Sequence, residues 1–249
     1  RAPPSFLTAL NDGGLDVASV ANNHGMDYGS SGFNDTLAAF ADSKLGLIGA
    51  GKNEAEAYAP DIVTVKGVKV AVIGATQVLD AQFISSWTAG STQPGLASAK
   101  QEDRLVAAVK DATTKADVVV VFLHWGTERS QCPNAAQKEI APKLADAGAQ
   151  IVVGSHAHVL VGGGYLGDSY VNYGLGNFLF YSGNRGGSQA QTGVQLVTVS
   201  DGKVTGDSWL PAKIGTNDLP TLLEGDKKAA ADASWQKLRD CTGLTATPQ

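Results

Sequence analysis

One unbroken apolar run constrains the fold of this chain more than any other feature. Asp117–Leu123 (DVVVVFL) contains four consecutive valines, and an uninterrupted apolar strand is typical of a sheet that is covered on both faces. Other β-branched runs alternate with helical patterns, such as Ser30–Ser43, in which Phe33, Leu37 and Phe40 share one face. This alternation predicts a layered α/β fold, with a sheet that is parallel in its first part and antiparallel later.

The same patterns predict the remaining elements. Helices are expected over Ser5–Asn11, Gln101–Lys115, Asn134–Ala147 and Ala229–Asp240, and strands over Asp16–Ala21, Asp61–Val65, Val68–Ile73, Ile151–Gly154, around Val159, and over Tyr170–Tyr173, Gly193–Val199 and Lys203–Ser208. We expect Gln77–Ala99 to be irregular. The run Gly162-Gly163-Gly164 does not precede a helix, so we expect a flexible hairpin tip and not a phosphate-binding loop.

Composition limits the class of protein. The 249 residues are 43% hydrophobic and 17% charged, which indicates a folded chain with a real core. A net charge of -5 argues against a general nucleic-acid-binding protein, which would usually present a basic face. The first residue is Arg1 and not Met, so we expect that an upstream segment has been removed or left out. We predict one main domain over residues 1–211, with a C-terminal helical extension over residues 212–249 packed on it.

The chain has two cysteines, Cys132 and Cys241, and neither belongs to a Cys-x-x-Cys pair. A zinc knuckle is therefore not expected. A disulfide and two inert thiols both remain open from the sequence. A disulfide would indicate an oxidising, extracytoplasmic location.

All four histidines come directly or shortly after predicted strands. His24 follows the first strand, His124 follows the apolar run, and His156 and His158 follow Ile151–Gly154. Ligands of open α/β sheets bind beyond the carboxyl ends of the strands, so three strand ends could bring every histidine to one rim. Each histidine alone could be a surface or buried structural residue, but the joint pattern predicts a metal site.

The residue types suit metal chemistry. Neutral imidazole is the commonest nitrogen ligand of zinc, iron and manganese, and Asn23 could add an amide oxygen. We therefore expect a divalent metal ion, Mn, Fe or Zn. A two-metal hydrolytic site clamps the attacking and leaving oxygens, while a histidine that is not a ligand protonates the leaving group.

Four motifs, in this order and spacing, resemble the capsule-synthesis CapA family: ANNHGMDYG (21–29), HWGTE (124–128), GSHAHV (154–159) and YGLGNFLF (173–180). The resemblance covers about residues 1–180. It implies the calcineurin-like metallophosphoesterase fold, a layered sandwich of mixed β-sheets flanked by helices. It also implies a function in bacterial poly-γ-glutamate synthesis or export.

By this resemblance Asn23, His124 and His156 would bind one metal, and His158 would reach toward a second. His24 would be the leaving-group acid or a phosphate contact. Asp27 would orient it, because a carboxylate partner fixes the tautomer of an imidazole.

Three further residues are candidates for substrate contact. Glu128 would lie beside the metal or contact the substrate, and Arg185 could contact an anionic one. Asn177 could contact the substrate or only shape the rim.

One departure concerns the acidic ligands. The family begins with a strand that carries a Gly-Asp motif, followed by an Asn-x-Glu motif, and this chain starts beyond both. Asp12 lies at a predicted helix end and Asp16 starts a strand, so neither replaces them well. We therefore expect that the first β-unit is absent and that the metal site is single, weakened or empty.

Two functions follow as hypotheses. The first is a metal-dependent hydrolase or transferase that acts on a phosphate ester or on an amide-type anionic polymer. The second is a non-catalytic component that binds or exports the polymer. Expected partners are poly-γ-glutamate or another anionic polymer and membrane-bound proteins of capsule synthesis, in an extracytoplasmic location, and nucleic acid is not expected.

Overall fold

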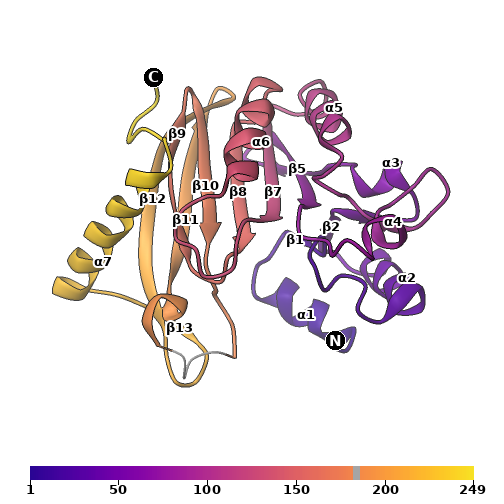
Figure 1. Ribbon diagram of the computed structural model, residues 1–249, viewed down its shortest axis with the longest axis horizontal. Coiled ribbons are helices and arrows are strands. Elements are labelled where there is room, and N and C mark those ends of the chain that lie inside the picture. Colours follow the sequence, from indigo (N-terminus) through magenta and orange to yellow (C-terminus); the bar gives the residue numbers. More distant parts are fainter. Residues whose placement is uncertain (182–185) are drawn as a thin grey trace. The chain divides into compact units, whose positions relative to one another are not determined.

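The computed structural model describes residues 1–181 and 186–249, which form two compact units, Arg1–His124 and Trp125–Gln249. Figure 1 labels their elements. Each unit combines helices with β-sheets, which confirms the predicted α/β class. The domain boundary expected after residue 211 stays a prediction. No helix in the described part of the chain is both long and apolar enough to span a membrane.

The first unit alternates short helices and strands. In chain order its elements are α1 (Ser5–Asp12), β1 (Val17–Ser19), α2 (Gly29–Ala41), β2 (Gly46–Ile48), β3 (Ala50–Gly51), α3 (Glu54–Ala57), β4 (Asp61–Val65), β5 (Val68–Thr76), α4 (Ile84–Trp87), β6 (Gly95–Leu96), α5 (Glu102–Ala112) and β7 (Val118–Trp125). Strand β7 ends on the first residue of the second unit.

Strand β5 organises the first unit. It pairs antiparallel with β4 and parallel with β7, from Val70 opposite Val118 to Thr76 opposite His124. The turn at Lys66-Gly67, between the two predicted strands β4 and β5, has φ of 50° and 86°, the left-handed conformation of a tight hairpin. Helix α5 packs against β5. The long apolar run forms β7, in which Val119, Val121 and Leu123 are buried.

Short strands complete this unit. Strands β1 and β2 pair parallel, and β3 and β6 pair antiparallel. The stretch Gln77–Ala99, expected to be irregular, contains α4 and β6. Trp87 stacks on Phe83 there, with ring centroids 4.5 Å apart. The expectation was therefore wrong for these two pieces.

The second unit contains two sheets. Its elements are α6 (Ala135–Asp146), β8 (Ile151–His156), β9 (Leu160–Leu166), β10 (Ser169–Leu175), the 3-10 helix η2 (Gly187–Ala190), β11 (Gln191–Ser200), β12 (Lys203–Ile214), β13 (Pro220–Leu222), α7 (Gly225–Leu238) and the 3-10 helix η3 (Arg239–Cys241). Strand β10 pairs parallel with β8 and antiparallel with β9. Strands β11, β12 and β13 form an antiparallel sheet.

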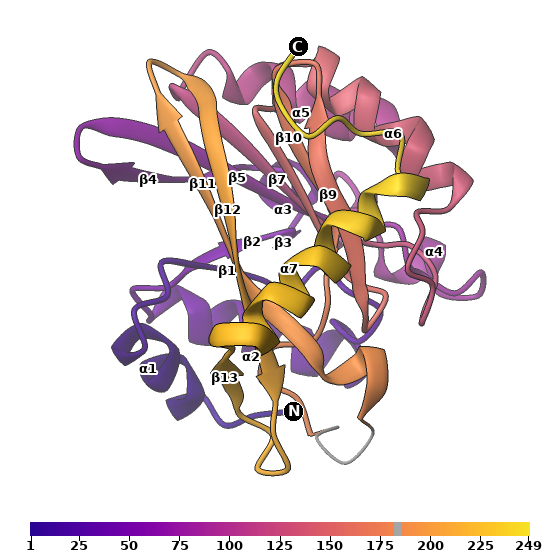
Figure 2. The same cartoon turned by 90° about the vertical axis from the view of Figure 1, so that its left-hand side faces the viewer.

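Helix α7 covers part of this unit. It packs against β9 and β12 and crosses the strands obliquely in Figure 2. Trp235 of α7 stacks on Trp209 of β12, with ring centroids 4.4 Å apart. Stacking of aromatic rings adds to the stabilisation from burial, so this pair anchors the helix.

The glycine run at 162–164 lies inside β9 and is not a flexible hairpin tip, so that expectation was wrong. A Cβ on Gly162 would lie 2.5 Å from the backbone of Leu238, and one on Gly164 would lie 2.4 Å from the carbonyl oxygen of Thr245. Glycine is needed here because the C-terminal segment packs directly on the strand backbone.

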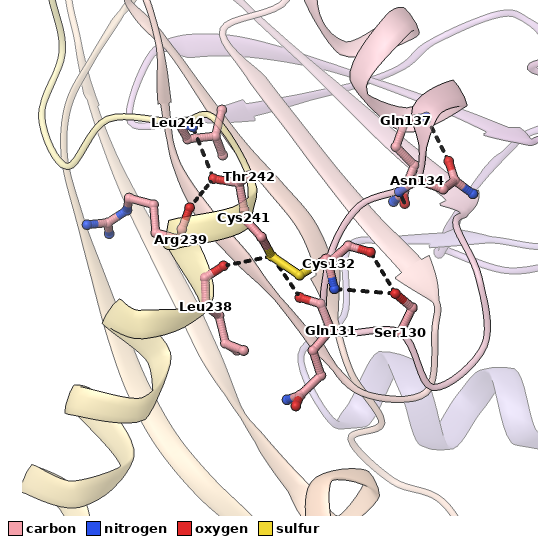
Figure 3. Close-up of a disulfide and its surroundings, with 10 residues drawn as sticks. All are labelled: Ser130, Gln131, Cys132, Asn134, Gln137, Leu238, Arg239, Cys241, Thr242 and Leu244. Carbon is pink, nitrogen blue, oxygen red and sulfur yellow. Dashed lines mark hydrogen bonds between the residues drawn. A yellow bond between two sulfur atoms is a disulfide. The ribbon is translucent and has the colours of Figure 1, made fainter.

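Cys132 and Cys241 form a disulfide, with Cα atoms 5.7 Å apart. Figure 3 shows that it joins the segment before α6 to η3. The hydroxyl of Ser130 donates to the carbonyl oxygen of Cys132 at 2.8 Å and braces that segment. The bond therefore connects two parts of the second unit that are 109 residues apart in sequence.

Replacing both cysteines (Cys132→Ser with Cys241→Ser) should lower the free energy of unfolding by about 4 to 5 kcal/mol, because the open chain gains entropy when it unfolds. Tryptophan fluorescence during urea unfolding would report the unfolding of the second unit, which holds Trp125, Trp209 and Trp235. Ser130→Ala keeps the disulfide and serves as the control. A loss below about 1 kcal/mol in the double variant would contradict this expectation.

Candidate functional site

The first group of polar residues lies in the turn after β1 and at the end of β7. The backbone N–H of His24 donates to Oδ1 of Asn22 at 2.8 Å, which closes a tight turn. Nε2 of His124 lies 2.8 Å from Oδ1 of Asn23. Nδ2 of Asn23 lies 3.3 Å from Nε2 of His24, and Nδ1 of His24 lies 2.9 Å from Oδ2 of Asp27.

These contacts form one continuous chain from a carboxylate to a strand end. The amide of Asn23 can donate only through Nδ2 and accept only through Oδ1. Because Oδ1 of Asn23 faces Nε2 of His124, that nitrogen must carry a proton. Because Nδ2 of Asn23 faces Nε2 of His24, that nitrogen must hold a lone pair. Nδ1 of His24 then carries the proton toward Asp27. The His24 side chain is 72% exposed, so a ligand from solvent can reach it.

With its proton moved from Nε2 to Nδ1, His124 would have a donor atom that suits a metal ion shared with Oδ1 of Asn23. Two atoms bound to one zinc ion at about 2.1 Å each lie about 3.0 to 3.4 Å apart. The observed 2.8 Å separation needs to open by only a few tenths of an ångström. Both donors are neutral, however, and a metal site of this kind also needs anionic ligands.

The second group lies in the turn between β8 and β9. His156 ends β8 and His158 follows two residues later, with φ of 93° and 57°. Residues other than glycine seldom adopt this conformation, and such strain clusters at functional sites. The backbone N–H of Arg129 donates to the carbonyl oxygen of Ala157 at 2.7 Å and holds the turn.

The two rings of this turn do not fit one metal ion together. Their centroids lie 6.3 Å apart, whereas two imidazoles on one tetrahedral zinc ion have centroids about 5 Å apart. The assignment of His156 and His158 to different metal ions stays a prediction. The ring of Phe180 lies 5.1 Å from that of His158 and covers it on one side.

Trp125 lies beside β8 at Gly154, two residues before His156, which begins this turn. Its indole N–H donates to the carbonyl oxygen of Tyr173 at 3.0 Å, and its ring stacks on that of Tyr173. A Cβ on Gly154 would lie 2.0 Å from Nε1 of Trp125, so β8 approaches the indole closely. Burial raises the pKa of Tyr173 to about 12, so its hydroxyl stays protonated well into the alkaline range.

The expected substrate contacts have different surroundings. Asn177 is only 6% exposed, and Oδ1 of its side chain lies 2.7 Å from Nδ1 of His158. Glu128 is exposed in the turn after β7. Arg185 lies outside the described residues. The assignment of these three residues to substrate binding stays a prediction.

The metal itself stays a prediction as well. Within residues 1–181 and 186–249, no three His, Cys, Asp or Glu side chains come close enough together to hold a metal ion. Asp12 ends α1, and exposed Asp16 precedes β1. The neutral donors thus fit part of such a site, and an acidic ligand set is not found among the described residues.

Sequence reasoning missed three supporting residues. Asn22 forms the turn that places His24, and an Asn two residues before a functional histidine could have signalled it. Trp125 and Arg129 act through long-range contacts, for which the sequence carries no local signal.

Comparisons with known proteins agree on one family. Residues 1–182 match the family described as bacterial capsule synthesis protein PGA_cap. The chain is 37% identical over 185 residues to the capsule biosynthesis protein CapA of Bacillus anthracis, covering 73% of this chain and 44% of that protein. It is 38% identical over 178 residues to the PGA biosynthesis protein CapA of Bacillus subtilis (strain 168), covering 71% and 46%. The chain therefore spans less than half the length of these relatives.

Solved structures show the same fold at low identity. A putative 5'-nucleotidase from Staphylococcus aureus, in complex with alpha-ketoglutarate, aligns with a TM-score of 0.52 at 16% identity, covering 95% of this chain and 47% of that one. A hypothetical protein from Thermus thermophilus aligns with a TM-score of 0.51 at 14% identity, covering 83% and 79%. These similarities confirm the expected metallophosphoesterase-like fold and say nothing of activity.

Proposed function

Because the chain belongs to the bacterial capsule synthesis protein PGA_cap family, we propose that it is a metal-dependent hydrolase or transferase in poly-γ-glutamate synthesis, export or processing. The observation that carries this proposal is the chain of contacts from Asp27 through His24 and Asn23 to His124. It joins an accessible acid–base residue to two donors that suit a divalent cation.

The roles of these residues follow from their contacts. Asp27 holds Nδ1 of His24 and so aims its Nε2 away from the carboxylate. Once the Asn23 amide turns away from this ring, Nε2 of His24 would carry a proton and donate it to the leaving oxygen or nitrogen of a substrate. Asn23, His124 and His156 would hold a metal ion, and His158 would serve a second one. The metal would supply Lewis acidity toward the substrate oxygen.

The ligand set gives the first test. Wild-type protein dialysed against Mn²⁺ or Zn²⁺ should retain metal, measured by inductively coupled plasma mass spectrometry. His124→Ala with His156→Ala should lose most of it, because both imidazole ligands are removed. His24→Ala is the matched control and should retain metal. Equal metal content in wild type and the double variant would refute the assignment.

The acid–base role gives the second test. His24→Ala should slow turnover of a p-nitrophenyl phosphodiester or a γ-glutamyl anilide by about 10²- to 10⁴-fold, since a positioned acid contributes this much. Asp27→Asn should slow it less, because an amide oxygen can still accept from Nδ1. Unchanged turnover in His24→Ala would exclude this residue as the acid.

A second function is a polymer-binding or export component without catalysis. The shortage of acidic metal ligands among the described residues favours it. Replacing all four histidines with alanine should then leave the affinity for poly-γ-glutamate, measured by isothermal titration calorimetry, within about twofold of wild type. Loss of polymer binding together with metal would instead support the hydrolase.

We further propose an extracytoplasmic location, which the disulfide supports because such bonds persist mainly in oxidising compartments. Alkylation and mass spectrometry of protein taken directly from its own cells would count the thiols. Free thiols at Cys132 and Cys241 would contradict this location.

A further inference from the structure

We propose that Asn177 is a positioning residue, which fixes the Nδ1–H tautomer of His158 and leaves Nε2 as the nitrogen that accepts a ligand. The tautomer follows from the contacts of Asn177 alone. Its consequence for ligand binding rests on the proposed function, because it decides which atom of His158 faces a cation or a phosphoryl group.

The orientation of the Asn177 amide is determined by its other partners. Nδ2 donates to the carbonyl oxygens of His158 at 3.2 Å and Gln189 at 3.1 Å. A flipped amide would place its oxygen against these two carbonyl oxygens, and two acceptors cannot bond to each other. Both amide hydrogens are therefore used, and Oδ1 must face the ring of His158.

This orientation decides the tautomer of His158. Oδ1 of Asn177 lies 2.7 Å from Nδ1 of His158. An amide oxygen can only accept, so Nδ1 must carry the proton. In the neutral ring, Nε2 then holds the lone pair. Free histidine in water favours the opposite tautomer, so the protein must impose this one.

The position of Asn177 makes it a rigid support. Asn177 is only 6% exposed, and the hydroxyl of Thr192 donates to its main-chain carbonyl oxygen. One amide thus holds both the ring and the main-chain carbonyl of His158. The second of these bonds also stabilises the backbone of His158 at φ of 57°.

The tautomer can be measured directly in metal-free protein. Long-range ¹H–¹⁵N correlation spectra at pH 8, where imidazoles are neutral, distinguish protonated from unprotonated ring nitrogens. Wild-type His158 should show a protonated Nδ1 and an unprotonated Nε2. With four histidines in the chain, His158→Gln assigns the signals by the loss of one set. An unprotonated Nδ1 in wild type would overturn the proposal.

Two variants test the role of Asn177. Asn177→Leu has a similar volume and no acceptor, so the His158 signals should move toward the Nε2–H tautomer of free histidine. The signals of His156, in the same turn, should keep their tautomer. Thr192→Val perturbs the same buried surroundings without touching the amide–imidazole pair, and should leave His158 as in wild type. An unchanged tautomer in folded Asn177→Leu would overturn the proposal.

Adding Zn²⁺ tests this inference and the proposed function separately. Added Zn²⁺ should shift Nε2 of His158 and leave Nδ1 protonated. A protein with the expected tautomer but no response to Zn²⁺ would refute metal binding by His158 and leave the positioning by Asn177 intact. Deprotonation of Nδ1 on binding Zn²⁺ would overturn the positioning role.

Discussion

The bond from the indole N–H of Trp125 to the carbonyl oxygen of Tyr173 ties the last residue of β7 to β10. Trp125 is completely buried, so leaving its N–H without an acceptor would cost about 1 to 3 kcal/mol. Strand β8 passes close to the indole at Gly154, where no side chain would fit. His156 follows two residues later. The position of the histidine turn thus depends on a buried aromatic side chain.

Two asparagine side chains make the same kind of contact with a histidine ring, but one can move more freely than the other. Asn23 and Asn177 each present Oδ1 to an imidazole nitrogen. Asn177 is buried and its hydrogens are bound to main-chain carbonyls. Asn23 is half-buried and its Nδ2 faces the exposed ring of His24. The contacts of Asn23 can therefore rearrange around a ligand at low cost. Those of Asn177 are fixed before a ligand binds.

Elements with a strong local pattern could be predicted from the sequence. Helix α2 and strands β4, β5 and β7 all lie within a few residues of their expected positions, because their apolar periodicity is local. Strands β2, β3, β6 and β13 were missed. They have only two or three residues each and form through distant partners, which no short window of sequence contains.

In the candidate site, too, some features could be predicted from the sequence and others could not. Its histidines could be found because they follow apolar strands, and the structure places His124 and His156 within the last two residues of β7 and β8. The contacts of Asn177 could not be found, because they join residues 12 to 19 positions apart through a buried turn. The glycines at 162–164 were misjudged for a similar reason. Their packing partners, Leu238 and Thr245, lie far along the chain.

The disulfide also changes what a protease can do to this protein. Cys132 and Cys241 enclose almost all of the second unit. A single cut at any exposed peptide bond between them would leave both pieces covalently attached, and the buried strands would keep their neighbours. After one such cut, the two pieces would separate covalently only when the disulfide is reduced. A chain of this kind can be nicked in a protease-rich environment and still persist as one molecule.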